Sequence, residues 1–159
     1  GSEGREKRII TSLQLNAPDL EAVNLRLQFK LAEIRKREQR STEMLTENVR
    51  LVVVGYGTAG RIAETAVKRA REDGMKVGLF RPITLWPFPE RRLSALADQV
   101  DAFLVVEMNA GQMLDDVRLA AGGQVPVSFV GRMGGVVPVP EEIYDKIEEI
   151  YVKLPVRVR

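Results

Sequence analysis

The chain has 159 residues, of which 45% are hydrophobic, and this suits one packed domain with an appendage. It contains no cysteine and no histidine. It therefore offers no thiolate or imidazole to zinc or an iron–sulfur cluster, and it lacks the commonest general base near neutral pH. Any chemistry would rest on carboxylates, lysine, arginine or a bound cofactor. The net charge of +2, without a long run of one sign, gives little indication of a nucleic-acid partner.

No apolar run approaches the ~20 residues of a membrane span, and no signal peptide is visible. The default expectation is therefore a cytoplasmic protein with neither a membrane nor a nucleic-acid partner. Gly1 and Ser2 resemble the scar of a cleaved tag. The abrupt start after them predicts that the chain is a piece of something larger.

Residues 1–48 predict an N-terminal strand followed by a long helical arm. Residues 8–13 (RIITSL) favour extended backbone and would add a fifth strand, not necessarily parallel, to the sheet described below. Residues 19–43 predict a helix whose apolar residues recur on one face, namely Leu20, Val23, Leu27, Leu31 and Ile34. The end of this helix is either solvated or a basic contact surface. The arm either packs on the domain or projects to a neighbour, and an uncovered apolar stripe would favour a homodimer.

Residues 49–159 predict an α/β domain, because strands alternate with helices of ten to sixteen residues. Such alternation implies right-handed crossovers and a mostly parallel sheet. The expected strands are 49–55, 75–80, 101–107 and 125–131. The expected helices are 58–74, 90–100 and 141–154, and residues 109–123 are expected to form a loop and then a helix.

The stretch LVVVGYGTAG, residues 51–60, joins a buried strand to a G-x-G-x-x-G motif at Gly55, Gly57 and Gly60. This motif between a strand and a helix is typical of a loop that binds a dinucleotide pyrophosphate. The second strand, however, ends in Phe80-Arg81 instead of the acidic residue that would bind the ribose. The alternative is that the glycines only allow a sharp turn and close packing. Even then, the free N–H groups of Gly57, Thr58 and their neighbours would attract an anion.

Four loops follow the carboxyl ends of the expected parallel strands, and their sequences carry a specific resemblance. The stretches VGLFRPITLWPFPE, FLVVEMNAGQMLDDVR and GRMGGVVPVPEEI resemble the C-terminal domain of the alpha subunit of 2-oxoacid:ferredoxin oxidoreductases, of the 2-oxoglutarate and 2-oxoisovalerate types. RIITSLQLNAPD and the charged helix after it are similar to the segment that precedes this domain. The resemblance spans nearly the whole chain.

The resemblance implies a fold like the C-terminal domain of transketolase: three α/β/α layers around a five-stranded sheet with one antiparallel strand. It implies oxidative decarboxylation of a 2-oxoacid, most nearly 2-oxoglutarate, to an acyl-CoA with electrons passing to ferredoxin. Thiamine diphosphate, Mg²⁺, coenzyme A and iron–sulfur clusters would belong to the full complex and not to this chain. The partners implied are a beta subunit, gamma- and delta-type subunits, the rest of the alpha subunit and, indirectly, ferredoxin. We therefore expect a non-catalytic, subunit-assembly domain, with a stand-alone NADP- or adenine-nucleotide-binding domain as the alternative.

Several residues of these loops are candidates for an interface or for the wall of an active site. They are Arg81, Trp86, Phe88, Glu107 and Asn109. Aromatic residues and arginine anchor interfaces, although Trp86 and Phe88 could instead be core. Glu107 could act as a general base, or could simply bond the following loop or Arg81.

Arg132, between glycines, could bind an anion together with the glycine loop, or could be an ordinary surface arginine. Asp115 and Asp116 are adjacent on an expected helix, so their side chains point apart and we expect them to be solvated.

Overall fold

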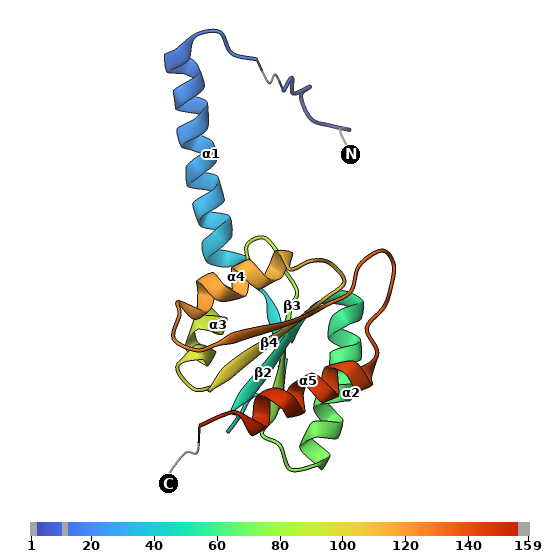
Figure 1. Cartoon of the computed structure of the whole chain (residues 1–159). Coiled ribbons are helices and arrows are strands. Elements are labelled where there is room, and N and C mark those ends of the chain that lie inside the picture. Colours follow the sequence, from blue (N-terminus) through green and yellow to red (C-terminus); the bar gives the residue numbers. More distant parts are fainter. Residues whose placement is uncertain (1–2, 11–12, 156–159) are drawn as a thin grey trace. The chain divides into compact units, whose positions relative to one another are not determined.

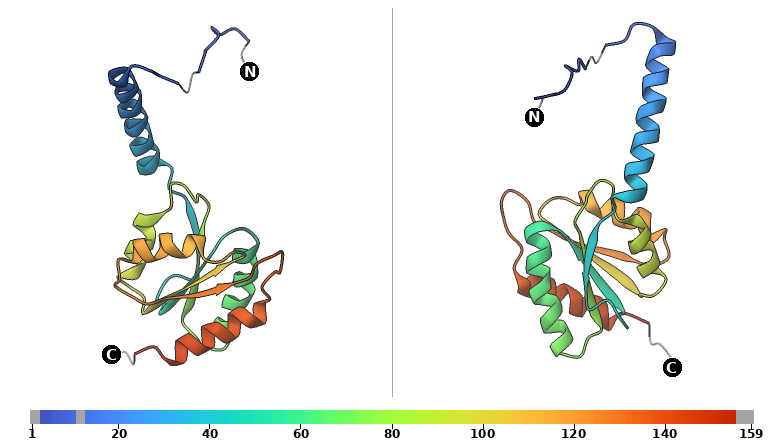
Figure 2. Two further views of the ribbon diagram at one scale, coloured as in Figure 1. Left: turned by 45° about the horizontal axis from the view of Figure 1, so that its top comes forward. Right: turned by 180° about the vertical axis from the view of Figure 1, so that it is seen from behind.

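The structure is a computed structural model that describes residues 3–10 and 13–155 (Figures 1 and 2). The expected tag scar at residues 1–2 therefore lies outside the described residues. The chain divides into two compact units, residues 1–37 and 38–159. The first unit contains α1 (Ala17–Arg37), and none of the side chains of α1 is buried.

The strand expected over residues 8–13 is absent from the part of it that the structure describes. Residues 8–10 and 13 have no strand structure, and residues 11 and 12 lie outside the described residues. Ile9 and Ile10 are almost fully exposed. The prediction was wrong for these residues because extended-backbone preference alone does not create a partner strand.

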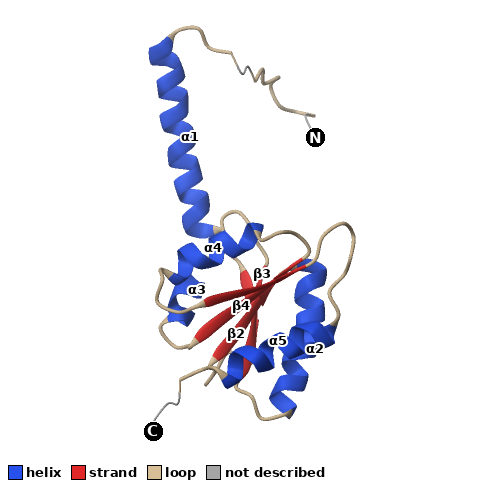
Figure 3. Ribbon diagram, in the orientation of Figure 1, coloured by secondary structure: helices blue, strands red, loops and turns tan. Residues whose placement is uncertain are grey.

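The second unit is built on a five-stranded sheet within the described residues, in the order β1-β3-β2-β4-β5 (Figure 3). Its strands are β1 (Ser41–Met44), β2 (Leu51–Gly55), β3 (Val77–Pro82), β4 (Ala102–Glu107) and β5 (Val127–Gly131). β2 to β5 run parallel, and β1 pairs antiparallel with β3. The expected mostly parallel α/β sheet with one antiparallel strand is confirmed.

The antiparallel strand comes from a segment that we expected to be helical. α1 ends at Arg37 instead of continuing to residue 43, and β1 pairs with β3 from Ser41 opposite Pro82 to Met44 opposite Leu79. The apolar stripe of the helix ends at Ile34, so continuing the helix would bury nothing, whereas the open edge of β3 supplies backbone partners. Residues 38–48 therefore belong to the sheet unit and not to the arm.

Helices cover both faces of the sheet, which gives three layers (Figure 1). They are α2 (Gly57–Glu72), α3 (Glu90–Ala97), α4 (Gln112–Ala121) and α5 (Pro140–Val152). Side chains of α3 and α4 pack with one face of the strands. Side chains of α2 and α5 pack with the other face. β2 and β4 are buried at every position, as expected for parallel strands covered on both sides.

Among the described residues, no helix is long and apolar enough to cross a membrane.

Candidate functional site

The carboxyl edge of the sheet gathers the candidate residues of the sequence analysis. β2 to β5 are parallel, so their carboxyl ends and the loops that follow lie at one edge of the sheet. β1 runs the other way and begins at this edge. The backbone N–H of Ile83 donates to the carbonyl oxygen of Arg40, at 2.9 Å, which ties the loop after β3 to the segment before β1.

The glycine loop between β2 and α2 is explained by backbone geometry. A Cβ added to Gly60 would lie 2.6 Å from the carbonyl oxygen of Gly55. A Cβ added to Gly55 would in turn lie 3.2 Å from the Cα of Gly60. Gly57 has space around it, but its φ of +53° is one that glycine adopts readily. The three glycines thus meet the needs of the turn and of close packing.

Gly57 and Thr58, in the first turn of α2, are exposed. The N-cap residue of this helix is Tyr56, and its side chain makes no capping hydrogen bond. The Arg81 side chain lies beside this turn, because a Cβ on Gly60 would lie 3.1 Å from its Nε atom. An Nη atom of Arg81 lies 3.8 Å from a carboxylate oxygen of Glu64.

The side chain of Arg132, a candidate anion ligand or ordinary surface arginine, has an acidic partner. Its guanidinium forms an ion pair with Glu142, near the start of α5. Its Nε donates to Glu142 Oε2 at 3.2 Å. A carboxylate already occupies the guanidinium, so the structure gives no support to Arg132 as an anion ligand.

The groove beside Arg132 has a volume of about 390 Å³, and its lining contains two ion pairs, Arg132 with Glu142 and Lys146 with Glu149. Its lining residues are Val130, Gly131, Arg132, Glu142, Asp145, Lys146 and Glu149. Lys146 and Lys153 lie 2.7 Å and 2.8 Å from the Glu149 carboxylate. Their hydrogen bonds and charges lower the pKa of Glu149 to about 2.

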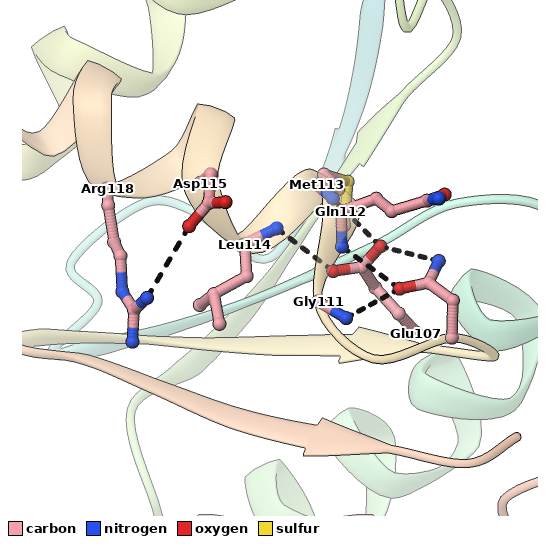
Figure 4. Close-up of polar contacts among 8 residues, drawn as sticks. Glu107, Gly111, Gln112, Met113, Leu114, Asp115 and Arg118 are labelled. Carbon is pink, nitrogen blue, oxygen red and sulfur yellow. Dashed lines mark hydrogen bonds and ion pairs between the residues drawn. The ribbon is translucent and has the colours of Figure 1, made fainter.

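Glu107, at the end of β4, is completely buried and caps α4 (Figure 4). Its Oε2 accepts hydrogen bonds from the backbone N–H of Met113 and from the Asn109 side-chain amide, both at 2.9 Å. Its Oε1 accepts from the backbone N–H of Leu114 at 2.9 Å. A negative charge at a helix N-terminus is stabilised by these free N–H groups and by the helix dipole.

Asn109 completes this arrangement. Its Oδ1 accepts hydrogen bonds from the backbone N–H groups of Gly111 and Gln112, at 2.7 Å and 3.0 Å. The side chains of Glu107 and Asn109 together therefore satisfy the start of α4. Of the alternatives considered for Glu107, the hydrogen bond to the following loop matches the geometry, and its carboxylate has no open side for a substrate proton.

Asp115 and Asp116 are exposed on α4, as expected. Asp115 lies 3.5 Å from Arg118, one helical turn away (Figure 4). Although the Asp116 side chain is exposed, its partial loss of contact with water raises the pKa of its carboxyl, and the charges of Asp115 and Glu107 raise it further.

The two aromatic residues in the loop after β3, Trp86 and Phe88, have different environments. Phe88 is only 9% exposed and belongs to the core beneath α3 and α4. Trp86 is 53% exposed. The loop between them is held by Thr84, whose hydroxyl donates to the carbonyl oxygen of Pro87 at 2.8 Å. Phe88 therefore has the packing role, and Trp86 remains available to a partner.

Trp86 is one of several exposed apolar side chains in these loops, which we call the carboxyl-edge apolar surface. Its members are Ile83, Leu85, Trp86, Met108, Met133, Val136, Val137 and Val139. The sequence analysis named only Trp86 among them. The others could have been predicted from apolar residues that lie in loops rich in proline and glycine and follow neither helix nor strand periodicity, as in GGVVPV.

The donor groups of this chain do not fit the metal cofactors that the resemblance implies for a full complex. Iron–sulfur clusters need cysteine thiolates, and the sequence has none. Within residues 3–10 and 13–155, no group of three or more acidic residues is placed to hold a metal ion. We therefore derive no step through a metal or cluster on this chain.

Comparisons with solved structures define the fold class. The chain matches a 2-oxoglutarate:ferredoxin oxidoreductase from Magnetococcus marinus, solved with 2-oxoglutarate, coenzyme A and succinyl-CoA bound, with a TM-score of 0.77 and 20% identity. That match covers 92% of this chain and 27% of the other. A split-gene transketolase, an inactive beta4 tetramer, matches with a TM-score of 0.62 and 17% identity over 73% of this chain and 42% of the other. The fold is transketolase-like.

Sequence comparisons show the family. Residues 50–143 match the family described as pyruvate:ferredoxin oxidoreductase core domain II. The ketoisovalerate oxidoreductase subunit VorB of Methanothermobacter marburgensis is 43% identical over 94% of this chain. The 2-oxoglutarate synthase subunit KorA of Methanothermobacter thermautotrophicus is 42% identical over 77% of it. The chain therefore belongs to this core domain II family of 2-oxoacid:ferredoxin oxidoreductase subunits.

The chain spans only part of these relatives, 42% of the VorB subunit and 32% of the KorA subunit. The comparisons do not favour the alternative of a stand-alone nucleotide-binding domain. The packing of Gly55 against Gly60 explains the glycine motif without a nucleotide.

Proposed function

We propose that this chain is a non-catalytic assembly domain of a 2-oxoacid:ferredoxin oxidoreductase. The observation that carries the proposal is the arrangement of charged and apolar side chains at the carboxyl edge of the sheet. This is the edge at which α/β proteins usually bind their ligands. Here Glu107 accepts hydrogen bonds from Asn109 and the start of α4, and Arg132 pairs with Glu142, while apolar side chains of the loops are exposed.

The contacts of two charged groups support the non-catalytic part of the proposal. The Glu107 carboxylate is fully buried and accepts three hydrogen bonds from α4 and Asn109. Arg132 is paired with Glu142. A general base must reach a substrate proton directly or through one water molecule, and these groups are already engaged within the domain.

The exposed loops support the assembly part. The carboxyl-edge apolar surface combines Trp86 with methionine and branched side chains, and aromatic residues and methionine are enriched at interfaces. Proline residues on either side of Trp86 restrict the loop before binding, which lowers the entropy lost on association. We propose that a companion subunit, or another part of a longer alpha subunit, covers this surface.

The full complex is proposed to convert a 2-oxoacid to an acyl-CoA and to pass electrons to ferredoxin. Thiamine diphosphate, Mg²⁺ and iron–sulfur clusters would be held by its other domains and subunits, and its location would be the cytoplasm. The sequence analysis favoured 2-oxoglutarate as the substrate. Ketoisovalerate has equal or better support, because VorB matches a larger share of this chain than KorA does at nearly the same identity.

Co-purification tests the proposal. The tagged chain is co-expressed with the companion subunits of a VorB- or KorA-type enzyme, and captured proteins are identified by mass spectrometry. We expect a companion subunit to be retained, and the chain alone to reduce no ferredoxin with either 2-oxoacid. Turnover by the isolated chain would contradict the non-catalytic role, and capture of no subunit would contradict the assembly role. Once a complex is reconstituted, its rates with 2-oxoglutarate and ketoisovalerate decide between the two substrates.

A further inference from the structure

α1 carries an apolar stripe with the spacing of a pairing helix. Leu20, Leu27 and Ile34 are seven residues apart, and Val23 and Leu31 lie beside them on the same side of the helix. A repeat of seven keeps one seam of a helix turned toward a partner helix. No side chain of α1 is buried, and the three leucines of the stripe, Leu20, Leu27 and Leu31, are 39%, 46% and 39% exposed.

The charges of α1 select the direction of pairing. The first turn holds Asp19, followed by Glu21, and the last turn holds Arg35, Lys36 and Arg37. Two parallel copies would align acidic with acidic ends and basic with basic ends. Two antiparallel copies place opposite charges side by side at both ends. Their helix dipoles then also point in opposite directions, which is favourable.

We propose that α1 pairs antiparallel with α1 of a second copy of this chain, along the stripe from Leu20 to Ile34. The two-fold axis passes near Leu27, so that Leu20 of each copy lies near Ile34 of the other. The acidic first turn of each copy then lies beside the basic last turn of the other, where Arg37 also pairs with Glu33 of its own helix at 2.7 Å. The surface meets itself, as a two-fold interface requires.

The same register places Arg26 of one copy near Lys30 of the other. This repulsion close to the axis offsets part of the attraction at the ends. The apolar stripe supplies the remaining driving force, because pairing removes the leucine and isoleucine side chains of both copies from water.

Single cysteines test the pairing and its direction, since the natural chain has none. Under mild oxidation we expect Leu27→Cys to form disulfide-linked dimers at least tenfold more than Phe29→Cys, a control on the opposite side of the helix. Leu20→Cys and Ile34→Cys should cross-link to each other when mixed, and far less with themselves. Self-linking of Leu20→Cys would overturn the antiparallel arrangement, and equal yields from Leu27→Cys and Phe29→Cys would overturn the stripe as the seam.

Light scattering after size exclusion gives a second readout without oxidation. The wild-type chain should have twice its 17.8 kDa mass. Leu27→Lys should return it to 17.8 kDa, while Phe29→Lys should leave the dimer intact. A purified wild-type chain of 17.8 kDa would overturn the proposal.

Discussion

Gly60 packs so closely on Gly55 that a Cβ at Gly60 would lie 2.6 Å from the Gly55 carbonyl oxygen and 2.9 Å from its carbonyl carbon. These contacts are with backbone atoms, which cannot rotate away as a side chain would. The first turn of α2 therefore rests directly on the end of β2. A sequence motif that is typical of nucleotide binding is here a packing requirement.

The contact predicts that Gly60→Ala lowers the free energy of unfolding by about 1–3 kcal/mol, the usual cost of overpacking a tight site. Urea unfolding measures it. Thr58→Ala, an exposed change in the same turn, is the control and should stay within about 0.5 kcal/mol of wild type. Equal stabilities of the two variants would mean that the turn has room for a side chain.

If the glycines of this loop serve packing alone, NADPH and adenine nucleotides should not stabilise the chain. A ligand that binds the folded state at a hundred times its Kd adds about 2.7 kcal/mol and raises the melting temperature. We expect no rise in thermal-shift measurements with either ligand. A saturable rise that Thr58→Ala leaves intact but Gly57→Ala abolishes would revive the nucleotide-binding alternative.

Glu107→Gln should lower the free energy of unfolding by about 1.5–3 kcal/mol. The amide replaces one carboxylate oxygen with an NH2 group, which would face the backbone N–H of either Met113 or Leu114 and leave that N–H without its acceptor. A charge-assisted hydrogen bond is worth about that amount. Glu90→Gln, in the exposed first turn of α3, is the matched control and should cost less than about 1 kcal/mol. If a reconstituted complex of Glu107→Gln folds normally yet loses turnover, a catalytic role for Glu107 must be reconsidered.

Glu43 makes the attachment of β1 sensitive to acid. Arg92 donates two hydrogen bonds to its carboxylate, at 2.5 Å and 2.8 Å, and this lowers the pKa of Glu43 below its ordinary 4.5. The pair stabilises the fold above pH 4.5, and its contribution disappears as the pH falls through the lowered value.

Glu43→Gln should therefore cost about 0.2–1 kcal/mol near neutral pH, since the pair is partly exposed, and almost nothing once the pH lies well below the lowered pKa of Glu43. Urea unfolding at a series of pH values follows the difference. Glu72→Gln, an exposed change at the end of α2, serves as the comparison. A difference between wild type and Glu43→Gln that stays constant across this range would exclude the ion pair as its cause.

The loop after β3 offers a test that separates packing from assembly. Phe88→Ala should lower the free energy of unfolding by about 3–5 kcal/mol, because its ring is in the core. Trp86→Ala should leave stability within about 0.5 kcal/mol but cost about 2 kcal/mol of affinity for the companion subunit, if it anchors an interface.

Leu119→Ala is the control for Trp86→Ala, because Leu119 is 80% exposed on α4, away from the carboxyl-edge loops. Unfolding curves and titration with the companion subunit provide the two readouts. Equal affinities of the Trp86→Ala and Leu119→Ala chains would leave the carboxyl-edge apolar surface without a role in assembly.

Much of the sheet unit could be predicted from sequence because its signals are local. The unbroken apolar run at 51–54 and the glycine after it fix a buried strand and a turn, whatever packs around them. β1 escaped prediction because the four residues STEM carry no apolar pattern, and only the open edge of β3 gives them a partner.

The sequence by itself determined the α/β class, the lack of thiolate and imidazole ligands, and the family resemblance, since these depend on residue identity and spacing along the chain. Only the tertiary structure decided that Glu107 caps α4, that Arg132 pairs with Glu142, and that Phe88 is buried while Trp86 is exposed. Partners of this kind come from elements distant in sequence or from the direction in which a side chain leaves a loop. A polar residue's role depends on which of its possible partners the fold brings within hydrogen-bond distance.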